Sequence, residues 1–100
     1  MTVTISPQAR ADLVDIFVQS AEGFELDVAD ARIDALSASI RGLESFPRAG
    51  QLIHANPEIR RLVVRPHIIL YGVNSDDVRV ARVIDGRRDI TSILDGITED

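Results

Sequence analysis

The residues of this chain best suited to chemistry are arginines that interrupt apolar stretches of its C-terminal half. Arg60, Arg61 and Arg65 fall in one stretch rich in Val and Ile, and Arg79 and Arg82 fall in another. A stretch that only had to build a core would not contain guanidinium groups, which pair with carboxylates and phosphates. The pattern therefore predicts an acidic protein partner or an anionic substrate on one face.

The same arginines have a second interpretation, in which they protect sheet edges and pair with acids of their own chain. Alternation along a strand places Arg61 and Arg65 on one face, and Arg60 on the other face with Leu62 and Val64. Since a charged group is buried at low cost only when it is paired, we expect at least one of these arginines to meet a carboxylate. Both interpretations stay open from the sequence.

His67 and Tyr71 are the candidates for acid–base chemistry. They lie four residues apart on one expected strand, hence on the same face. They are about 13 Å apart along that strand, which is too far for both to act on one atom. We therefore favour a structural interpretation, with a histidine at the start of a strand and a half-buried tyrosine whose hydroxyl is hydrogen-bonded.

The segment Gly86-Arg87-Arg88-Asp89 is the clearest candidate for a functional loop. It also fits a glycine turn in which Asp89 caps a following helix. Phe24 falls in the link between two expected helices, where an exposed aromatic side chain suits a protein contact. The sequence contains no phosphate-binding glycine loop, no Ser/His/Asp arrangement and no cluster of metal ligands. No metal and no cofactor are predicted.

Composition indicates one small acidic domain over residues 1–100. The net charge is −5, and all eleven basic residues are arginine. Domains that bind nucleic acid through phosphates tend to be basic, so this balance argues against that class. Seven of the sixteen acids fall between residues 12 and 34, and seven of the eleven arginines fall in the C-terminal half, which predicts an acidic helical side and a more basic sheet side. Without cysteine, a signal peptide pattern or a membrane-spanning stretch, we expect a cytoplasmic protein with no membrane contact.

Periodicity predicts the elements that position these residues. Two helices joined by a short link are expected to form an antiparallel hairpin, because the second has an apolar stripe that suits a neighbouring helix. Ser6 and Pro7 begin the first helix, and Gly23 ends it. The expected strands are 2–5, 58–65, 67–74 and 77–84, with a loop or marginal strand at 51–57; the expected helices are 7–23, 26–45 and 90–94, and 96–100 is expected to fray.

The order of elements is β-α-α-β-β-β with a short C-terminal helix, which is an α+β fold. Consecutive strands with short turns predict antiparallel pairing. The helical hairpin must bury its apolar stripe, so we expect it on one face of a small antiparallel sheet. The other face is expected to stay partly open.

An ordered set of motifs runs through these elements. After the helical hairpin come Leu43-x-x-x-Pro47-x-x-Gly50, Ile59-Arg60-Arg61-Leu62, Ile68-x-Leu70-Tyr71 and Arg82-Val83-Ile84-x-Gly86-Arg87-Arg88-Asp89. From about Ile5 to about Ile90, this order resembles the RelE/ParE superfamily of toxins from bacterial type II toxin–antitoxin modules. Its details are closer to ParE than to RelE, and the resemblance implies the same fold.

The resemblance to ParE implies a toxin that poisons DNA gyrase through a protein–protein contact, without bond-making chemistry. It further implies a cognate ParD-like antitoxin that neutralises the toxin by direct binding, and contact with operator DNA only through that antitoxin. On this hypothesis the candidates for target binding are Arg87 and Arg88. The candidates for antitoxin binding are Phe24, Arg60, Arg61, Arg65 and Arg82.

A RelE-like ribosome-dependent mRNA nuclease is the second hypothesis. Metal-free RNA cleavage needs a base, an acid and cations for the phosphorane charge. Such relatives use lysines, and many have a histidine before the Gly-Arg-Arg loop, whereas this chain has no lysine and has Asp85 there. These departures favour ParE. The candidate catalytic residues would be Arg61, Arg65, Tyr71, Arg82 and Arg87. A third hypothesis is a degenerate toxin that only binds its antitoxin.

Overall fold

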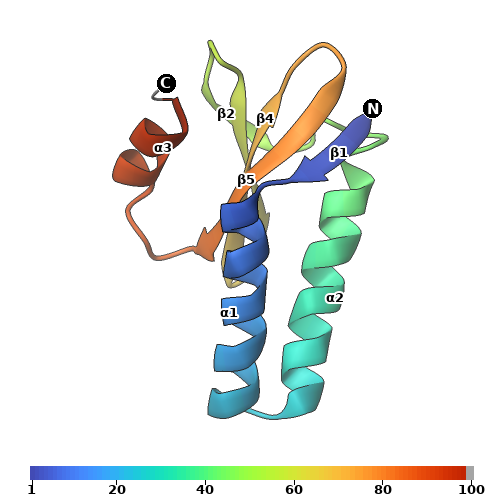
Figure 1. Ribbon diagram of the computed structural model, residues 1–100, viewed down its shortest axis with the longest axis vertical. Coiled ribbons are helices and arrows are strands. Elements are labelled where there is room, and N and C mark those ends of the chain that lie inside the picture. Colours follow the sequence, from blue (N-terminus) through green and yellow to red (C-terminus); the bar gives the residue numbers. More distant parts are fainter. Residues whose placement is uncertain (99–100) are drawn as a thin grey trace.

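A computed structural model of the protein describes residues 1–98. These residues form a long helical hairpin, a five-stranded sheet and a third, shorter helix (Figure 1). Within residues 1–98, no helix is both long and apolar enough to span a bilayer. The elements in chain order are β1 (Thr2–Ile5), α1 (Pro7–Gly23), α2 (Leu26–Gly42), β2 (Gln51–His54), β3 (Ile59–Val64), β4 (His67–Val73), β5 (Asp77–Asp85) and α3 (Ile90–Thr98).

The N-terminus of α1 is formed as the sequence predicts. The Ser6 Oγ accepts a hydrogen bond from the Ala9 amide at 3.0 Å, and Pro7 occupies the first helical position. The same hydroxyl donates to the Ala81 carbonyl of β5 at 2.8 Å. One buried serine therefore caps the helix and holds its start against the sheet.

Helix α2 ends three residues earlier than the predicted residue 45, at Gly42. The Leu43 amide donates to the Ile40 carbonyl and the Glu44 amide to the Arg41 carbonyl, so the last turn tightens to bonds that span three residues. The predicted end at 45 is wrong because this turn satisfies the terminal carbonyls and directs the chain back toward the sheet.

The strand order is β1-β5-β4-β3-β2. Strands β2 to β5 pair antiparallel with their neighbours, which confirms the pairing predicted for the consecutive strands. Strand β1 runs parallel to β5, so the sheet is mixed. The hairpin lies between β1 and the rest of the sheet in sequence, and such a long crossover is what a parallel pair requires. The marginal strand expected within 51–57 is β2.

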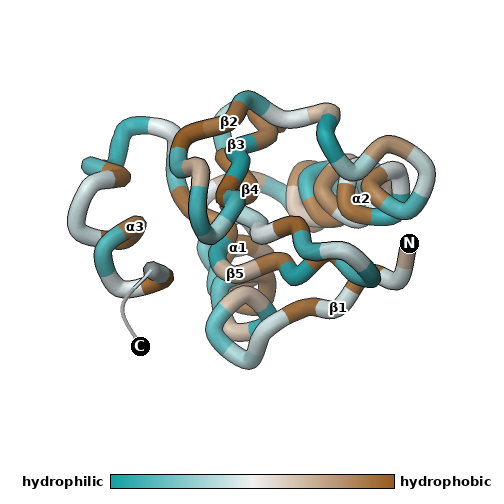
Figure 2. The backbone as a smooth tube through the Cα atoms, turned by 90° about the horizontal axis from the view of Figure 1, so that it is seen from above, coloured by the Kyte–Doolittle hydropathy of each residue, from teal (hydrophilic) through white to brown (hydrophobic). Residues whose placement is uncertain are grey.

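The hairpin covers one face of the sheet, and α3 covers only part of the other, as expected (Figure 2). The hairpin packs on one face over Tyr71, Val80 and their neighbours, which form the main core with Leu36 and Leu43. The predicted fold class is confirmed by this layering.

On the other face, α3 covers a small apolar cluster formed by Ile68, Leu70 and Ile84. Helix α3 contacts this cluster through Ile90, Ile93 and Ile97, and none of the residues of α3 is fully buried. The helix passes the predicted end at residue 94 because Ile97 packs on the cluster one turn later. The fraying predicted from residue 96 is therefore wrong for 96–98, and 99–100 lie outside the described residues.

Candidate functional site

Arg60 and Glu58 attach the loop before β2 to the sheet. The Arg60 Nε donates to Glu58 at 2.7 Å, and its Nη1 donates to the Gly50 carbonyl at 2.8 Å. Glu58 also accepts from Arg48 at 3.0 Å. Hydrogen bonds from Arg60 and then Arg48 lower the pKa of the Glu58 carboxyl below its usual value. Arg60 therefore has a structural role on the helix-facing side of β3.

Arg82 joins β5 to α1. Its Nε and Nη2 donate to the Asp12 carboxylate at 2.7 and 3.1 Å, a bidentate pair. Asp12 also accepts from the Val83 amide at 2.9 Å. Strand β1 pairs with β5 only as far as Val80, so the carboxylate satisfies an amide on the uncovered part of the strand. The hydrogen bond to Asp12 raises the pKa of Arg82.

Tyr71 is fully buried in the main core. Its hydroxyl accepts a hydrogen bond from the Gly50 amide at 2.9 Å, and burial raises the pKa of the phenol. The approach of the loop is so close that a Cβ at Gly50 would lie 2.5 Å from the Arg61 carbonyl oxygen. The predicted hydrogen bond of the hydroxyl is confirmed, whereas the predicted half-burial is wrong because the ring lies wholly within the core.

The remaining candidates lie on different surfaces. Arg61 reaches across the face away from the hairpin and donates to Gln51 at 2.9 Å. Arg65 is exposed in the turn between β3 and β4, and Arg87 and Arg88 are exposed in the loop after β5. Three residues of the predicted sets nevertheless meet in one cleft, namely Phe24, Arg65 and Arg87.

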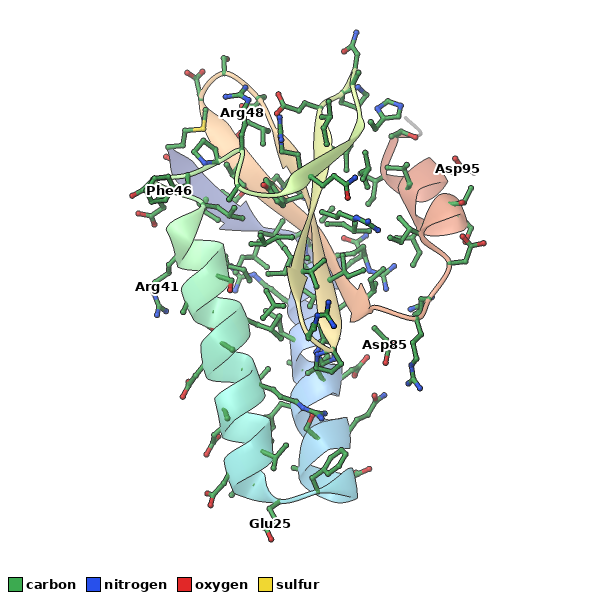
Figure 3. The ribbon with its side chains drawn as sticks, turned by 180° about the vertical axis from the view of Figure 1, so that it is seen from behind. Glu25, Arg41, Phe46, Arg48, Asp85 and Asp95 are labelled. Carbon is green, nitrogen blue, oxygen red and sulfur yellow. The ribbon has the colours of Figure 1, made fainter. Side chains whose placement is uncertain are left out.

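This cleft lies between the C-terminal half of α1, the hairpin tip and the end of the sheet. Figure 3 shows Asp85 at that end of the sheet, beside the hairpin whose tip contains Glu25. The cleft has a volume of ≈ 580 Å³. The Gly86 amide donates to the Pro66 carbonyl at 2.8 Å, so the two loops that form its sheet side are held together. The side chains that decide its chemistry are Phe24, Arg32, Arg65, His67, Asp85 and Arg87.

Asp85 is fixed inside the cleft by the residue two positions later. Its carboxylate accepts from the Arg87 amide at 2.9 Å and from the guanidinium Nε and Nη2 at 3.1 Å each. These hydrogen bonds lower the pKa of Asp85 to about 2. The carboxylate is therefore ionised at neutral pH and organises the Gly86-Arg87 turn.

His67 pairs with Asp85 across the β4–β5 ladder and is only 8% exposed. Burial first, and then the positive charge of Arg32, lower its pKa below the usual 6.5, while Asp85 opposes the shift. The imidazole is therefore neutral at pH 7. Within residues 1–98 no hydrogen bond to its ring is found.

Arg32 is the residue of this cleft that sequence reasoning missed. It donates to the Ser20 hydroxyl at 3.0 Å, and its guanidinium lies 4.8 Å from the centre of the Phe24 ring. The contact is a cation–π interaction between the two helices of the hairpin. Helical spacing alone does not distinguish Arg32 from other polar residues of α2, because its partners depend on how the helices pack.

The cleft brings together only two of the five residues named for a nuclease, Arg65 and Arg87. Tyr71 faces the main core, Arg61 lies on the opposite face of the sheet, and Arg82 is occupied by Asp12. The five candidate catalytic residues therefore do not converge on one point. Among residues 1–98 no group of three His, Asp or Glu side chains is arranged to hold a metal ion.

A second hollow of ≈ 610 Å³ separates α3 from the sheet. Arg79 and Arg82 line it on the sheet side, and Ile93 and Ile97 line it on the helix side. Its presence agrees with the partial burial of α3 on the small cluster. It contains none of the residues expected to contact a target.

Comparison with known proteins gives consistent matches. A family model described as the ParE toxin of the type II toxin–antitoxin system parDE matches residues 3–90. The chain is 31% identical over 84 residues to Toxin ParE3 of Caulobacter vibrioides. The aligned region covers 83% of this chain and 84% of that protein. A solved structure described as the chromosomal ParDE TA system from P. aeruginosa has a TM-score of 0.74 at 17% identity, covering 85% of this chain and 95% of that chain.

Proposed function

The chain belongs to the ParE toxin family of type II toxin–antitoxin systems, and from this we propose that it inhibits growth by binding DNA gyrase in the cytoplasm. A ParD-like antitoxin neutralises it by direct contact. Neither step makes or breaks a covalent bond on this chain, and no cofactor takes part. Operator DNA is bound only through the antitoxin.

The observation that supports a binding mode of action is the position of Tyr71. A nuclease would need this hydroxyl at the substrate, but it is buried and accepts a hydrogen bond from the Gly50 amide. Of the four arginines that would assist it, Arg65 and Arg87 share one cleft, whereas Arg61 and Arg82 lie outside it and bind Gln51 and Asp12. A toxin that acts through surface contacts needs no such convergence.

We propose that Arg87 and Arg88 contact the target, and that Phe24 and Arg65 contact the antitoxin. These side chains are exposed, and Phe24 keeps 62% of its surface accessible. Arg60, Arg61 and Arg82 already have partners within the chain, so an antitoxin contact with them would have to replace those bonds. The description of the P. aeruginosa structure as a ParDE system supports an antitoxin partner.

The first test is pulse labelling after induction of this chain alone. Thymidine and methionine incorporation are followed over the first minutes. We expect DNA synthesis to fall while translation continues. An early fall in protein synthesis would instead favour the ribosome-dependent nuclease, and no fall in either would favour a degenerate toxin that only binds its antitoxin.

A pair of matched variants assigns the target contact. Replacing Arg87 and Arg88 by Ala is expected to abolish the fall in DNA synthesis. Replacing Arg10 and Arg41 by Ala removes the same charge from exposed helix positions and is expected to leave the fall unchanged. Equal effects of the two pairs would contradict a specific role for the loop.

A further inference from the structure

We propose that the cleft between the hairpin tip and the end of the sheet binds a carboxylate side chain of the antitoxin, with a large apolar residue next to it. The proposal rests on the proposed function, since it takes the antitoxin as the occupant. It adds a specific site and a specific chemistry. The groups that make the site are Phe24, Arg32, Arg65, His67 and Arg87.

Charge is the first reason for an anionic ligand. The cleft is lined by three arginines and one aspartate, and His67 is neutral, so three positive charges less one negative leave a local charge of +2. The whole chain has a net charge of −5. The exposed acids of the hairpin tip, such as Glu22 and Glu25, do not line the cleft. A positive hollow in an acidic protein attracts an anionic group locally.

The unused hydrogen-bond donors are the second reason. Arg87 is bound to Asp85, and Arg32 is bound to Ser20. Within residues 1–98, by contrast, Arg65 forms no ion pair, and the nearly buried ring of His67 has no hydrogen-bond partner. The ring nitrogens of His67 are not among the buried atoms without a partner, so they remain accessible from the cleft that the ring lines. One carboxylate, with two oxygens, can accept from the Arg65 guanidinium and from the His67 N–H.

Asp85 favours a carboxylate over a phosphate. Its ionised carboxylate lies inside the cleft, so each added negative charge on a ligand is repelled. A nucleic-acid backbone would bring several such charges to a protein that is acidic overall. A single side-chain carboxylate brings only one, and it can bind on the side of Arg65 and away from Asp85.

The apolar part of the cleft lining determines which antitoxin residue can bind beside the carboxylate. The Phe24 ring, Ile16 and Pro66 form this part of the lining. Phe24 is held by the guanidinium of Arg32 on one face of its ring, so it is positioned before a ligand arrives. A side chain such as Leu or Phe next to the acid would pack against it. An acidic, amphipathic segment therefore fits the cleft better than a uniformly acidic one.

A pair of peptides tests this chemistry directly on the full-length chain. Acetyl-Asp-Leu-Phe-amide and acetyl-Asn-Leu-Phe-amide have nearly the same shape and differ in the carboxylate. Amide shifts of the 15N-labelled protein are followed as each peptide is added. We expect saturable shifts at Phe24, Arg65, His67 and Gly86 with the Asp peptide, and binding about tenfold weaker with the Asn peptide. Equal binding of the two, or no binding, overturns the proposal.

Charge-reversed variants assign the site. Arg65→Glu is expected to reduce binding of the Asp peptide by about tenfold or more, because the main donor becomes a repelling group. Arg41→Glu makes the same change of net charge at the exposed end of α2, away from the cleft (Figure 3), and is expected to change binding by about twofold at most. Equal losses in both variants would mean a general charge effect and would overturn the site.

Inorganic phosphate is the competing probe. If phosphate displaces the Asp peptide at lower concentration than acetate does, the cleft prefers phosphate and the carboxylate proposal is wrong. The cognate ParD-like antitoxin of the proposed function provides the final arm. Its complex with Arg65→Glu is expected to dissociate about tenfold faster than its complex with Arg41→Glu. Equal rates would overturn the cleft proposal while the pulse-labelling result, and with it the proposed function, stands.

Discussion

Tyr71 is the residue at which the two modes of action make opposite predictions. Tyr71→Phe removes the oxygen that accepts from the Gly50 amide and leaves that amide buried without a partner. We expect the free energy of unfolding to fall by about 1–3 kcal/mol. Toxicity is expected to persist, because the hydroxyl touches neither cleft nor target. Urea denaturation measures the first effect and plating after induction the second.

The outcome that contradicts this interpretation of Tyr71 is a variant of unchanged stability that has lost its toxicity. Such a result would return the hydroxyl to a catalytic role and favour the nuclease. Loss of toxicity together with loss of fold would be resolved by working at a lower temperature, where the variant stays folded.

His67 gives the protein a pH-dependent stability of defined sign. The folded state holds its pKa below 6.5 through burial and the charge of Arg32, so on acidification the unfolded state takes up a proton first. Stability contributed by the neutral ring is present above the unfolded pKa and is lost as the pH falls through the window between the two values. We expect the urea midpoint to fall as the pH is lowered through about 6.5.

His67→Gln should remove this fall, because glutamine does not titrate. The carboxyl group nearest the ring does not titrate in the same pH range, so the comparison of the variant with the wild-type chain reports on His67. Asp85, the nearest acid, has a pKa of about 2, well below the window. Arg87 keeps its charge throughout it, because its hydrogen bond to Asp85 raises its pKa. An identical pH profile in the variant and the wild-type chain would show that His67 is not the titrating group.

Residue-scale prediction from the sequence succeeded for local chemistry and failed for long-range partners. That at least one strand arginine meets a carboxylate is confirmed by Arg60 with Glu58, two residues away, and by Arg82 with Asp12. Asp12 is 70 residues from Arg82, and nothing in periodicity identifies that pair. Arg32 was missed for the same reason. Such contacts depend on how helices dock, which a one-dimensional pattern does not specify.

At the scale of elements, the pair of Asp12 and Arg82 fixes α1 on β5. Asp12→Ala leaves the Arg82 guanidinium and the Val83 amide without their acceptor. The side chains of Asp12 and Arg82 are both partly buried. We expect a loss of about 2–3 kcal/mol in unfolding free energy. In a double-mutant cycle with Arg82→Ala, the coupling is expected to be about 1–3 kcal/mol.

The matched control for this cycle is the exposed pair of Arg87 and Asp85, which is short-range and solvated. Its coupling is expected to be much smaller, in line with surface ion pairs. If the two cycles gave equal couplings, Asp12 and Arg82 would not be the main link between α1 and β5. If the Arg82→Ala variant stays folded but loses toxicity, the nuclease hypothesis, in which Arg82 is a catalytic candidate, would be favoured again.

Element boundaries were predictable where a local signal exists. Ser6 and Pro7 begin α1, and Asp89 caps α3 by accepting from the Thr91 amide at 2.9 Å. The errors came where tertiary contacts decide. The end of α2 depends on the turn to the sheet, and the length of α3 depends on Ile97 meeting a cluster on another element. The parallel placement of β1 at the sheet edge is equally non-local.

The separation of charges predicted from the composition is only partial, because the hairpin also exposes Arg10 and Arg41 and the C-terminal half also exposes Asp76 and Asp89. Exposed acids of the hairpin include Glu22, Asp27 and Asp34, whereas the exposed arginines Arg65 and Arg88 lie at the end of the sheet and in the loop after it. The net charge of −5 nevertheless dominates at a distance. A polyanion approaching the free toxin is therefore repelled before it can reach a local arginine.

We therefore expect the free chain not to bind DNA from its own promoter region at about 0.1 M salt, where screening extends over about 10 Å. Its complex with the proposed ParD-like antitoxin is expected to bind, with the affinity falling as salt rises because counterions are released. Fluorescence anisotropy of a labelled DNA fragment measures both, and a scrambled fragment of equal length is the control. Binding by the free chain with a steep salt dependence would mean that its arginines contact phosphates directly. It would also weaken the argument that the acidic balance excludes nucleic acid, and with it the preference of the cleft for a carboxylate.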